Sequence, residues 1–267
     1  MSETVSTATT PPPAYPARLN GHLEPGLSRW LWVIKPLLVL PHVLVLAVLW
    51  LAVTVLTVFA GFAILFTGRY PRSIFEFNTG VMRWTWRVSF YTFSAFGTDR
   101  YPPFTLQRDP TYPADFSVDY PDHLSRWLVL VKWWLLALPH YVVVAVFAGG
   151  WGVGWNGAWR VAASGGLVTV LALAGAVVLA ASGRYPDSVF DVLMGMNRWC
   201  YRVLAYVALL RDEYPPFRFD RGGTDPGEFA RLVPPPANPP TAGTPTADLP
   251  AAGAPTADAP PAGLPNR

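Results

Sequence analysis

The sequence predicts an all-α membrane protein of two tandem repeats, each a transmembrane helical hairpin followed by an amphipathic, aromatic-rich helix, with disordered termini. Composition is the first observation that predicts it. Hydrophobic residues make up 52% of the 267-residue chain and charged residues only 14%, against about 25% charged residues in soluble domains. The second observation is the spacing of the charges, which leaves uncharged runs of 33, 27 and 23 residues between Lys35 and Arg69, Lys132 and Arg160, and Arg160 and Arg184. Runs of this length can cross a hydrocarbon core about 30 Å thick.

An internal duplication is the third observation, and it predicts the two repeats. The recurring motifs are Ser28-Arg29-Trp30 with Ser125-Arg126-Trp127, Pro41-His42 with Pro139-His140, Gly68-Arg69-Tyr70-Pro71 with Gly183-Arg184-Tyr185-Pro186, Arg83-Trp84 with Arg198-Trp199, and Tyr-Pro-Pro-Phe at 101–104 and 214–217. Chance does not produce so many matches in the same order. We call residues 15–105 the first copy and residues 106–220 the second copy. Residues 1–14 and 221–267, rich in Pro, Ala, Gly and Thr, are expected to be disordered.

The order of these motifs resembles the bacterial membrane family catalogued as domain of unknown function 4389 (DUF4389). The resemblance covers about residues 15–105 and 112–220. Members of that family are known as predicted membrane proteins without an assigned activity, so the resemblance implies an architecture and no chemistry. The sequence departs from the family pattern in its enlarged second copy. It also departs in Asp99-Arg100-Tyr101, where the second copy has Asp212-Glu213-Tyr214.

A glycine-rich stretch in the second copy predicts where its hairpin turns. About 17 extra residues separate Pro-His from Gly-Arg-Tyr-Pro there, and turn-forming residues among them predict spans at about 128–149 and 161–181. The first copy lacks these residues. It is therefore expected to form a tighter hairpin, at about 31–48 and 51–66, with Trp50 near the turn.

A third helix is expected after each Gly-Arg-Tyr-Pro motif, at about 73–97 and 188–210. Its polar residues recur in steps of four, three, four and four, which place them on one narrow stripe of a helix. They are Glu76, Gly80, Arg83, Arg87 and Tyr91 in the first copy, and Asp191, Gly195, Arg198, Arg202 and Tyr206 in the second.

Two topologies remain open for this striped helix. If it crosses the membrane, each copy has three spans and the copies are inverted. If it lies in the membrane interface, the chain has four spans and nearly all Lys and Arg fall on one side. The positive-inside rule favours four spans, in a multi-pass protein of the plasma membrane with both termini in the cytoplasm.

Motif arginines and tyrosines are the candidate binding residues. Arginine presents two parallel donors to a phosphate and tyrosine adds a third, so a cradle for an anionic lipid headgroup is one interpretation. The other is topology anchoring by cations and aromatic rings at the membrane surface. The candidate residues are Arg29, Arg69, Tyr70, Arg83, Arg87, Arg126, Arg184, Tyr185, Arg198 and Arg202.

Four further polar residues lie within or beside the apolar runs: Lys35, His42, Lys132 and His140. Ionisable groups at membrane depth often serve a function such as proton relay. The structural alternative is that each histidine bonds a backbone carbonyl freed by the proline before it. No metal site is expected, because no third ligand accompanies the histidines, and the single Cys200 excludes an internal disulfide.

The sequence has no nucleophile–base pair, phosphate loop or paired carboxylates at catalytic spacing, so we expect neither an enzyme nor a cofactor. The leading hypothesis is a non-catalytic, lipid-interacting or scaffold component. Expected partners are membrane lipids, anionic ones included, and a second copy or another membrane protein, but not nucleic acid. Two alternatives remain open: a transporter or channel subunit with a site at the interface of the repeats, and a lipid-modifying enzyme that uses His42 or His140.

Overall fold

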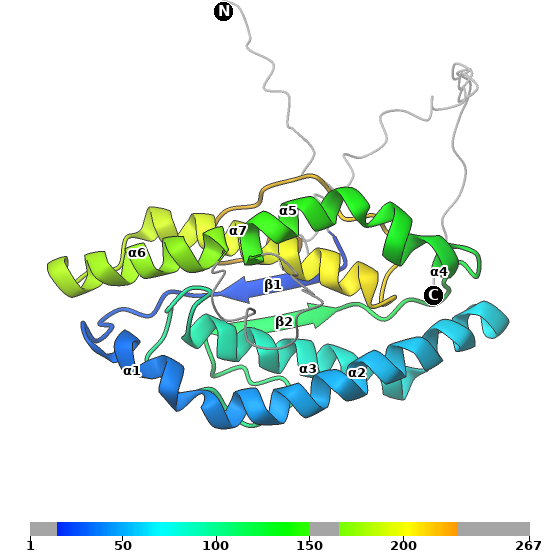
Figure 1. Ribbon diagram of the computed structural model, residues 1–267, viewed down its shortest axis with the longest axis horizontal. Helices are drawn as coiled ribbons and strands as arrows, with labels where there is room; N and C mark the ends of the chain where they lie inside the picture. The colour runs from blue at the N-terminus through cyan, green and yellow to red at the C-terminus, as the bar shows by residue number, and fades with distance from the viewer. Residues whose placement is uncertain (1–14, 150–165, 229–267) are drawn as a thin grey trace, which may run out of the picture. The chain divides into compact units, whose positions relative to one another are not determined.

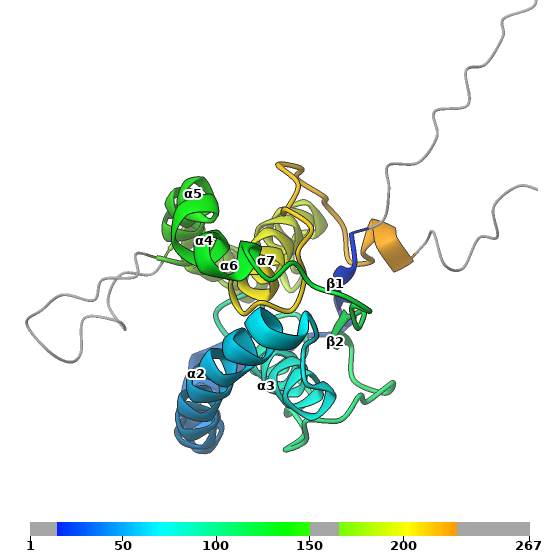
Figure 2. The same cartoon turned by 90° about the vertical axis from the view of Figure 1, so that its right-hand side faces the viewer.

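A computed structural model describes residues 15–149 and 166–228; the predicted disorder at 1–14 and 229–267 lies outside these residues. The described elements are β1 (Ala17–Gly21), α1 (Leu31–Leu38), α2 (Leu40–Thr67), α3 (Arg72–Tyr91), β2 (Ala114–Val118), α4 (Leu128–Val131), the π-helix η1 (Lys132–Leu136), α5 (Leu138–Ala148), α6 (Leu167–Ser182) and α7 (Asp187–Val207). Figure 2 shows α2 and α5 on one side, α3 and α7 in the middle and the two strands on the other side. We call α2, α5 and α6 the outer helices.

The apolar run of the first copy forms one helix, α2, and the predicted hairpin at 31–48 and 51–66 is wrong. The 28 residues of α2 extend about 42 Å at 1.5 Å per residue. The helix passes through Trp50, whose indole Nε1 donates to Thr85 Oγ1 of α3 at 3.0 Å. It ends at Gly68, whose φ of 72° is the left-handed conformation common at helix ends. No residue near Trp50 favours a turn, and a helix satisfies every backbone group of an apolar segment internally.

In the second copy, α5 and α6 together take the place of α2. The end of α5 meets the start of α6: a Cβ on Gly166 would lie 2.0 Å from the backbone nitrogen of Gly149. Figure 1 shows the two helices following one another, and both pack against α7. The extra residues therefore lie between two apolar helices that follow one another, and the predicted antiparallel hairpin is not observed. The helical segment at 128–148 matches the span predicted at 128–149, with a bend of 48°, whereas α6 is shorter than the span predicted at 161–181. The predicted turn, at about 150–160, lies outside the described residues.

One described helix, α2, is long and apolar enough to cross a membrane, and α4–η1 with α5, bent by 48°, is a second candidate if the pair counts as one span. Four spans are therefore not observed in the described chain. Only 17% of the most apolar window of α2 is buried, whereas a core helix of a soluble protein is mostly buried. Its exposed side chains include Leu44 at 72% and Phe66 at 73%. An apolar surface of this extent marks an interaction site.

The helices expected after each Gly-Arg-Tyr-Pro motif are present as α3 and α7, and both end earlier than predicted. The two five-residue strands were not predicted, so the fold is mostly helical with a small sheet rather than all-α. β1 and β2 pair antiparallel, with Leu19 opposite Phe116 at the centre. β1 comes from the first copy and packs against α7 of the second, while β2 of the second copy packs against α3 of the first. Each copy thus completes the packing of the other.

Candidate functional site

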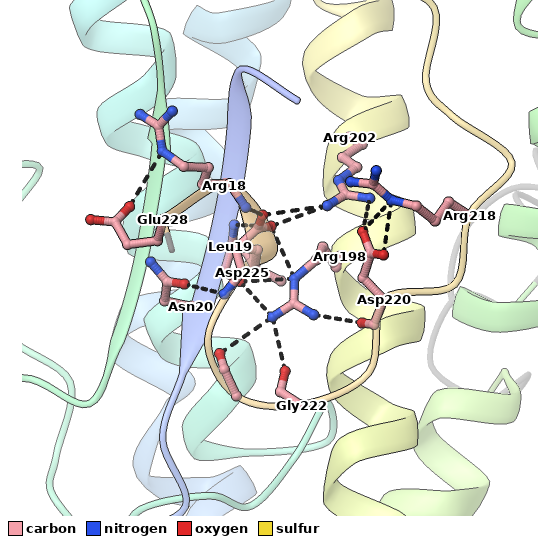
Figure 3. Close-up of polar contacts among 12 residues, drawn as sticks. Arg18, Leu19, Asn20, Arg198, Arg202, Arg218, Asp220, Gly222, Asp225 and Glu228 are labelled. Atoms are coloured by element: carbon pink, nitrogen blue, oxygen red, sulfur yellow. Dashed lines mark hydrogen bonds and ion pairs between the residues drawn. The ribbon is translucent and has the colours of Figure 1, made fainter. Parts of the chain in front are cut away.

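Two buried clusters surround the striped arginines. The second-copy cluster, drawn in Figure 3, consists of Arg198, Arg202, Asp220 and Asp225. Arg198 Nε lies 3.0 Å from Asp225 Oδ2, and both side chains are fully buried. Burial lowers the pKa of Arg198, and the nearby Asp225 carboxylate opposes that shift. Arg198 also donates to the carbonyl oxygens of Leu19 at 3.0 Å and Gly222 at 2.9 Å. The cluster therefore joins α7 to β1 and to the chain after Tyr-Pro-Pro-Phe.

Asp225 lies in the segment predicted to be a disordered tail from residue 221, and for residues 221–228 that prediction is wrong. Its carboxylate accepts hydrogen bonds from the backbone nitrogens of Leu19 at 3.3 Å and Gly227 at 2.9 Å. A buried carboxylate is tolerated when cations and hydrogen bonds compensate it. The missed signal is Asp225-Pro226, an N-cap residue followed by proline at the start of a helical turn.

The first-copy cluster consists of Arg83, Arg87, Arg108 and Asp115. Arg83 donates to the carbonyl oxygens of Phe116 at 2.8 Å and Leu106 at 2.9 Å. Arg87, fully buried, donates to the Gln107 carbonyl oxygen at 2.8 Å. In both copies the striped arginines therefore bind oxygens of the chain itself, and their role here is to hold strands and loops.

The glycines of the stripe allow this close approach. A Cβ on Gly80 would lie 3.0 Å from Leu106 Cβ, and one on Gly195 would lie 2.9 Å from Phe219 Cζ. The chain after each Tyr-Pro-Pro-Phe motif thus crosses its helix at the glycine. The adjacent arginines then reach the carbonyl oxygens of that crossing chain.

The two lysines form a further pair of buried contacts, with the same geometry in both copies. Lys35 Nζ lies 2.8 Å from Asp99 Oδ1 and donates to the Thr98 carbonyl oxygen at 2.7 Å. The backbone nitrogen of Ser28 donates to the other Asp99 oxygen at 2.6 Å. The same contacts recur in the second copy, in Lys132, Asp212, Arg211 and Ser125. The lysines join the Ser-Arg-Trp motif to the chain before Tyr-Pro-Pro-Phe, and Asp99 is the partner that sequence analysis did not assign.

Both histidines are fully buried beneath the Tyr-Pro-Pro-Phe motifs. His42 Nδ1 accepts a hydrogen bond from Trp84 Nε1 at 3.0 Å, and its ring stacks on Phe104 with centroids 3.8 Å apart. His140 makes the equivalent contacts with Trp199 at 3.3 Å and Phe217 at 4.4 Å. An Nδ1 that accepts leaves the ring proton on Nε2. The partner of each Nδ1 is therefore an indole and not the carbonyl expected from the sequence, and His140 also interacts with the backbone of Pro215.

The motif tyrosines are buried. Tyr70 OH accepts from Asn78 Nδ2 at 2.9 Å, and Tyr185 OH donates to the Ala172 carbonyl oxygen at 3.4 Å. Tyr70 OH also donates to the Ala208 carbonyl oxygen of the second copy at 3.4 Å, whereas Tyr185 OH bonds within its own copy. Both side chains are largely buried, at 1% and 7% exposure, and their hydroxyls are engaged by groups of the protein itself.

Four motif arginines remain exposed: Arg29, Arg69, Arg126 and Arg184. The Ser-Arg-Trp arginine of each copy lies against the Gly-Arg-Tyr-Pro glycine of the other. A Cβ on Gly183 would lie 2.5 Å from Arg29 Nη2, and one on Gly68 would lie 3.5 Å from Arg126 Nε. None of these four side chains forms an ion pair within the described chain. Of the predicted cradle, these are the residues that can bind an external anion.

Within residues 15–149 and 166–228, no three His, Cys, Asp or Glu side chains are grouped to hold a metal ion. The described residues define a helical protein in which two similar copies pack reciprocally and present an exposed apolar layer. A family model, Domain of unknown function (DUF4389), matches residues 29–105 and 157–218, together more than half of the chain. The chain belongs to the DUF4389 family, and the two matched segments are consistent with a two-copy arrangement. No curated protein and no solved structure matches it.

Proposed function

We propose that this protein is a non-catalytic membrane component that rests in a lipid bilayer through its outer helices and interacts with lipids. The observation that carries the proposal is the exposure of α2: an uncharged helix of 28 residues whose most apolar window is 17% buried. Apolar surface gains about 25 cal/mol per Å² when it leaves water. A helix of this kind is therefore stabilised by a hydrocarbon environment.

Charged residues on the side of the molecule that carries the strands, the strand face, support an orientation in which the outer helices lie along the membrane surface. Arg83 is near the middle of α3 (Arg72–Tyr91), and its neighbour Arg108 is 57% exposed. If the helices crossed the bilayer, this charge would lie near its centre, at a cost of about 2.5–3.5 kcal/mol or more. With the helices along the surface, the strand face is in water. We place that face in the cytoplasm, with both ends of the described chain, because the motif arginines are then on the cytoplasmic side.

Membrane fractionation tests the membrane proposal. We expect the protein to stay with membranes through an alkaline carbonate wash. Phe59 is 60% exposed on α2. The Phe59→Lys variant places a charge on this apolar surface and is expected to shift protein toward the wash fraction. The control Thr111→Lys alters an exposed residue near the strands and is expected to leave the distribution unchanged. Recovery of the wild-type protein as a soluble monomer without detergent would refute the proposal.

Cysteine accessibility tests the orientation. Glu76 is exposed near the start of α3, and Ser188 is exposed near the start of α7. The starts of α3 and α7 lie at opposite ends of the antiparallel outer helices (Figure 1). Glu76→Cys and Ser188→Cys are expected to react with an impermeant maleimide from the same side of the membrane. Reaction from opposite sides would show that the outer helices cross the bilayer and that the copies are inverted.

A further inference from the structure

We propose that a cleft at one end of the molecule binds a zwitterionic phospholipid headgroup with a phosphate and a primary ammonium group. The cleft has a volume of about 360 Å³ and lies between loop 23–27 of the first copy and the Gly-Arg-Tyr-Pro turn of the second. Residues of its lining that carry the argument are Leu23, Glu24, Leu179, Arg184, Tyr185 and Asp187. The assignment rests on the proposed membrane location, and it adds a ligand class and a site.

The cationic side of the cleft is suited to a phosphate. Arg184 lines the cleft, and the Arg29 guanidinium lies against Gly183, the residue before it. Neither side chain is engaged in an ion pair with a described residue, as noted above for the four exposed arginines. Two guanidinium groups from different copies can therefore converge on one phosphate, each through paired N–H donors.

The acidic side of the cleft is suited to an ammonium group. Asp187 is exposed at the start of α7. Although Arg184 precedes it by only three residues, the two form no ion pair in the described structure, so both charges are available to a ligand. Glu24 already pairs with Arg100 at 2.7 Å, which leaves Asp187 as the carboxylate for the ligand. Opposite charges on one small cleft match a headgroup that carries both signs.

The other end of the molecule differs at the equivalent positions. Leu23 in the first copy corresponds to Tyr120 in the second, 97 residues later. The Tyr120 ring occupies the space against Phe75, with centroids 5.0 Å apart, and its hydroxyl donates to the Tyr70 carbonyl oxygen. The position of Asp187 is taken by Arg72, whose guanidinium lies 5.2 Å from the centre of the Tyr120 ring. This end therefore lacks the leucine that leaves room, and it carries a cation in place of the carboxylate at the position of Asp187.

The apolar lining joins the cleft to the membrane layer. Leu179 belongs to α6, one of the outer helices, and the adjacent Val178, about 100° around the helix, is 43% exposed. An acyl chain attached to the bound phosphate can therefore follow α6 into the hydrocarbon region. This continuity favours a lipid over a free phosphate as the source of the headgroup.

The test is lipid retention by the purified full-length protein, measured by native mass spectrometry. The protein is equilibrated in nanodiscs of phosphatidylethanolamine, phosphatidylcholine and phosphatidylglycerol in equal parts and then released. The wild-type protein is expected to retain phosphatidylethanolamine in preference to the other two. Leu23→Tyr, which copies the filled end, is expected to abolish retention. Arg184→Gln is expected to reduce it about tenfold, the loss of one charge-assisted contact.

Asp187→Asn is the sharper variant, because the exposed side chain changes only its charge. It is expected to abolish the preference for phosphatidylethanolamine over phosphatidylglycerol while phosphate binding persists. Arg69→Gln at the other end is the matched control and is expected to leave retention unchanged. An unchanged preference in Asp187→Asn, full retention in Leu23→Tyr, or displacement of the lipid by millimolar inorganic phosphate alone would each overturn the assignment.

Failure of this inference can be separated from failure of the membrane proposal. All variants are also carried through the carbonate wash, where each is expected to fractionate with membranes like the wild type. Wild-type fractionation combined with no lipid preference overturns only the cleft assignment. Release of the wild-type protein by the wash overturns the membrane proposal itself.

Discussion

The first-copy and second-copy clusters share one scaffold but differ in charge balance. In both, an arginine of the striped helix reaches the central carbonyl of the strand from the other copy. The first-copy cluster has one carboxylate, Asp115, whereas the second-copy cluster has two, Asp220 and Asp225. The strands explain the difference, because Arg18 in β1 occupies the position that Asp115 occupies in β2. The second-copy cluster therefore draws its carboxylates from residues 218–228, which belong to the fold and not to a tail.

Removal of Asp225 is expected to produce the largest effect on stability. Asp225→Ala leaves two buried guanidinium groups without their shared carboxylate, and breaking a buried pair costs about 3–5 kcal/mol. The free energy of unfolding, measured by denaturant titration in detergent, is expected to fall by this amount. The matched control is Glu228→Gln, because Glu228 lies 3.4 Å from Arg18 and is partly exposed. A loss in Asp225→Ala no greater than in that control would show that the buried pair does not hold the segment.

Asp115→Ala in the first-copy cluster is expected to cost less, about 1–3 kcal/mol. Asp115 is 14% exposed, so water compensates part of the lost interaction. Arg83 and Arg87 also keep their bonds to carbonyl oxygens. The same titration measures the loss. A cost equal to that of Asp225→Ala would mean that burial does not distinguish the two clusters.

These differences show how far the sequence predicts the structure. The motif duplication, the striped helices and their polar residues follow from spacing, since a 3.6-residue period is a local property. The strands do not, because each has five residues and is stabilised by a partner strand 97 residues away. The hairpin expected in the first copy was inferred from the extra residues of the second copy. Those residues separate α5 from α6, whereas α2 is one continuous helix at the equivalent position, where Trp50 bonds to Thr85.

The candidate site was predicted only in part, for a related reason. Ten arginines and tyrosines were proposed from residue type, and residue type does not reveal which are exposed. Burial separates the exposed arginines, such as Arg29, from those like Arg87 that bind backbone oxygens. The contrast between Leu23 and Tyr120 became informative only when the structure placed both beside a Gly-Arg-Tyr-Pro turn.

At the lysines the two copies are expected to behave alike. Lys35→Met and Lys132→Met each remove one ion pair of 2.8 Å and one bond to a carbonyl oxygen. Each is expected to cost about 1.5–3 kcal/mol, the range for hydrogen bonds of charged groups. Thermal unfolding of the two variants side by side measures the difference. A large difference between them would contradict the equivalence of the two copies at this position.

At the histidines a small difference between the copies is expected. His42→Phe removes the acceptor of Trp84, an indole that is 5% exposed, at a hydrogen-bond length of 3.0 Å. His140→Phe removes the longer bond of 3.3 Å to Trp199, which is only partly buried. A buried unsatisfied donor costs about 1–3 kcal/mol, so His42→Phe is expected to lower the unfolding temperature more. The reverse order would show that stacking on Phe104 and Phe217, and not the indole bond, dominates.

The smallest expected effect concerns Cys200, which stands in α7 where the first copy has Thr85. Burial raises the pKa of the Cys200 thiol to about 12. The reactive form is the thiolate, so at pH 8 only about one molecule in ten thousand is reactive. Alkylation of the folded protein is expected to be slow and to accelerate about tenfold per pH unit up to pH 12. Cys200→Thr, which copies the first copy, is expected to change the free energy of unfolding by less than about 1 kcal/mol. Rapid labelling of native protein at pH 8 would show instead that this face of α7 opens, and that the second copy, with its interrupted outer helix, packs less tightly there than the first.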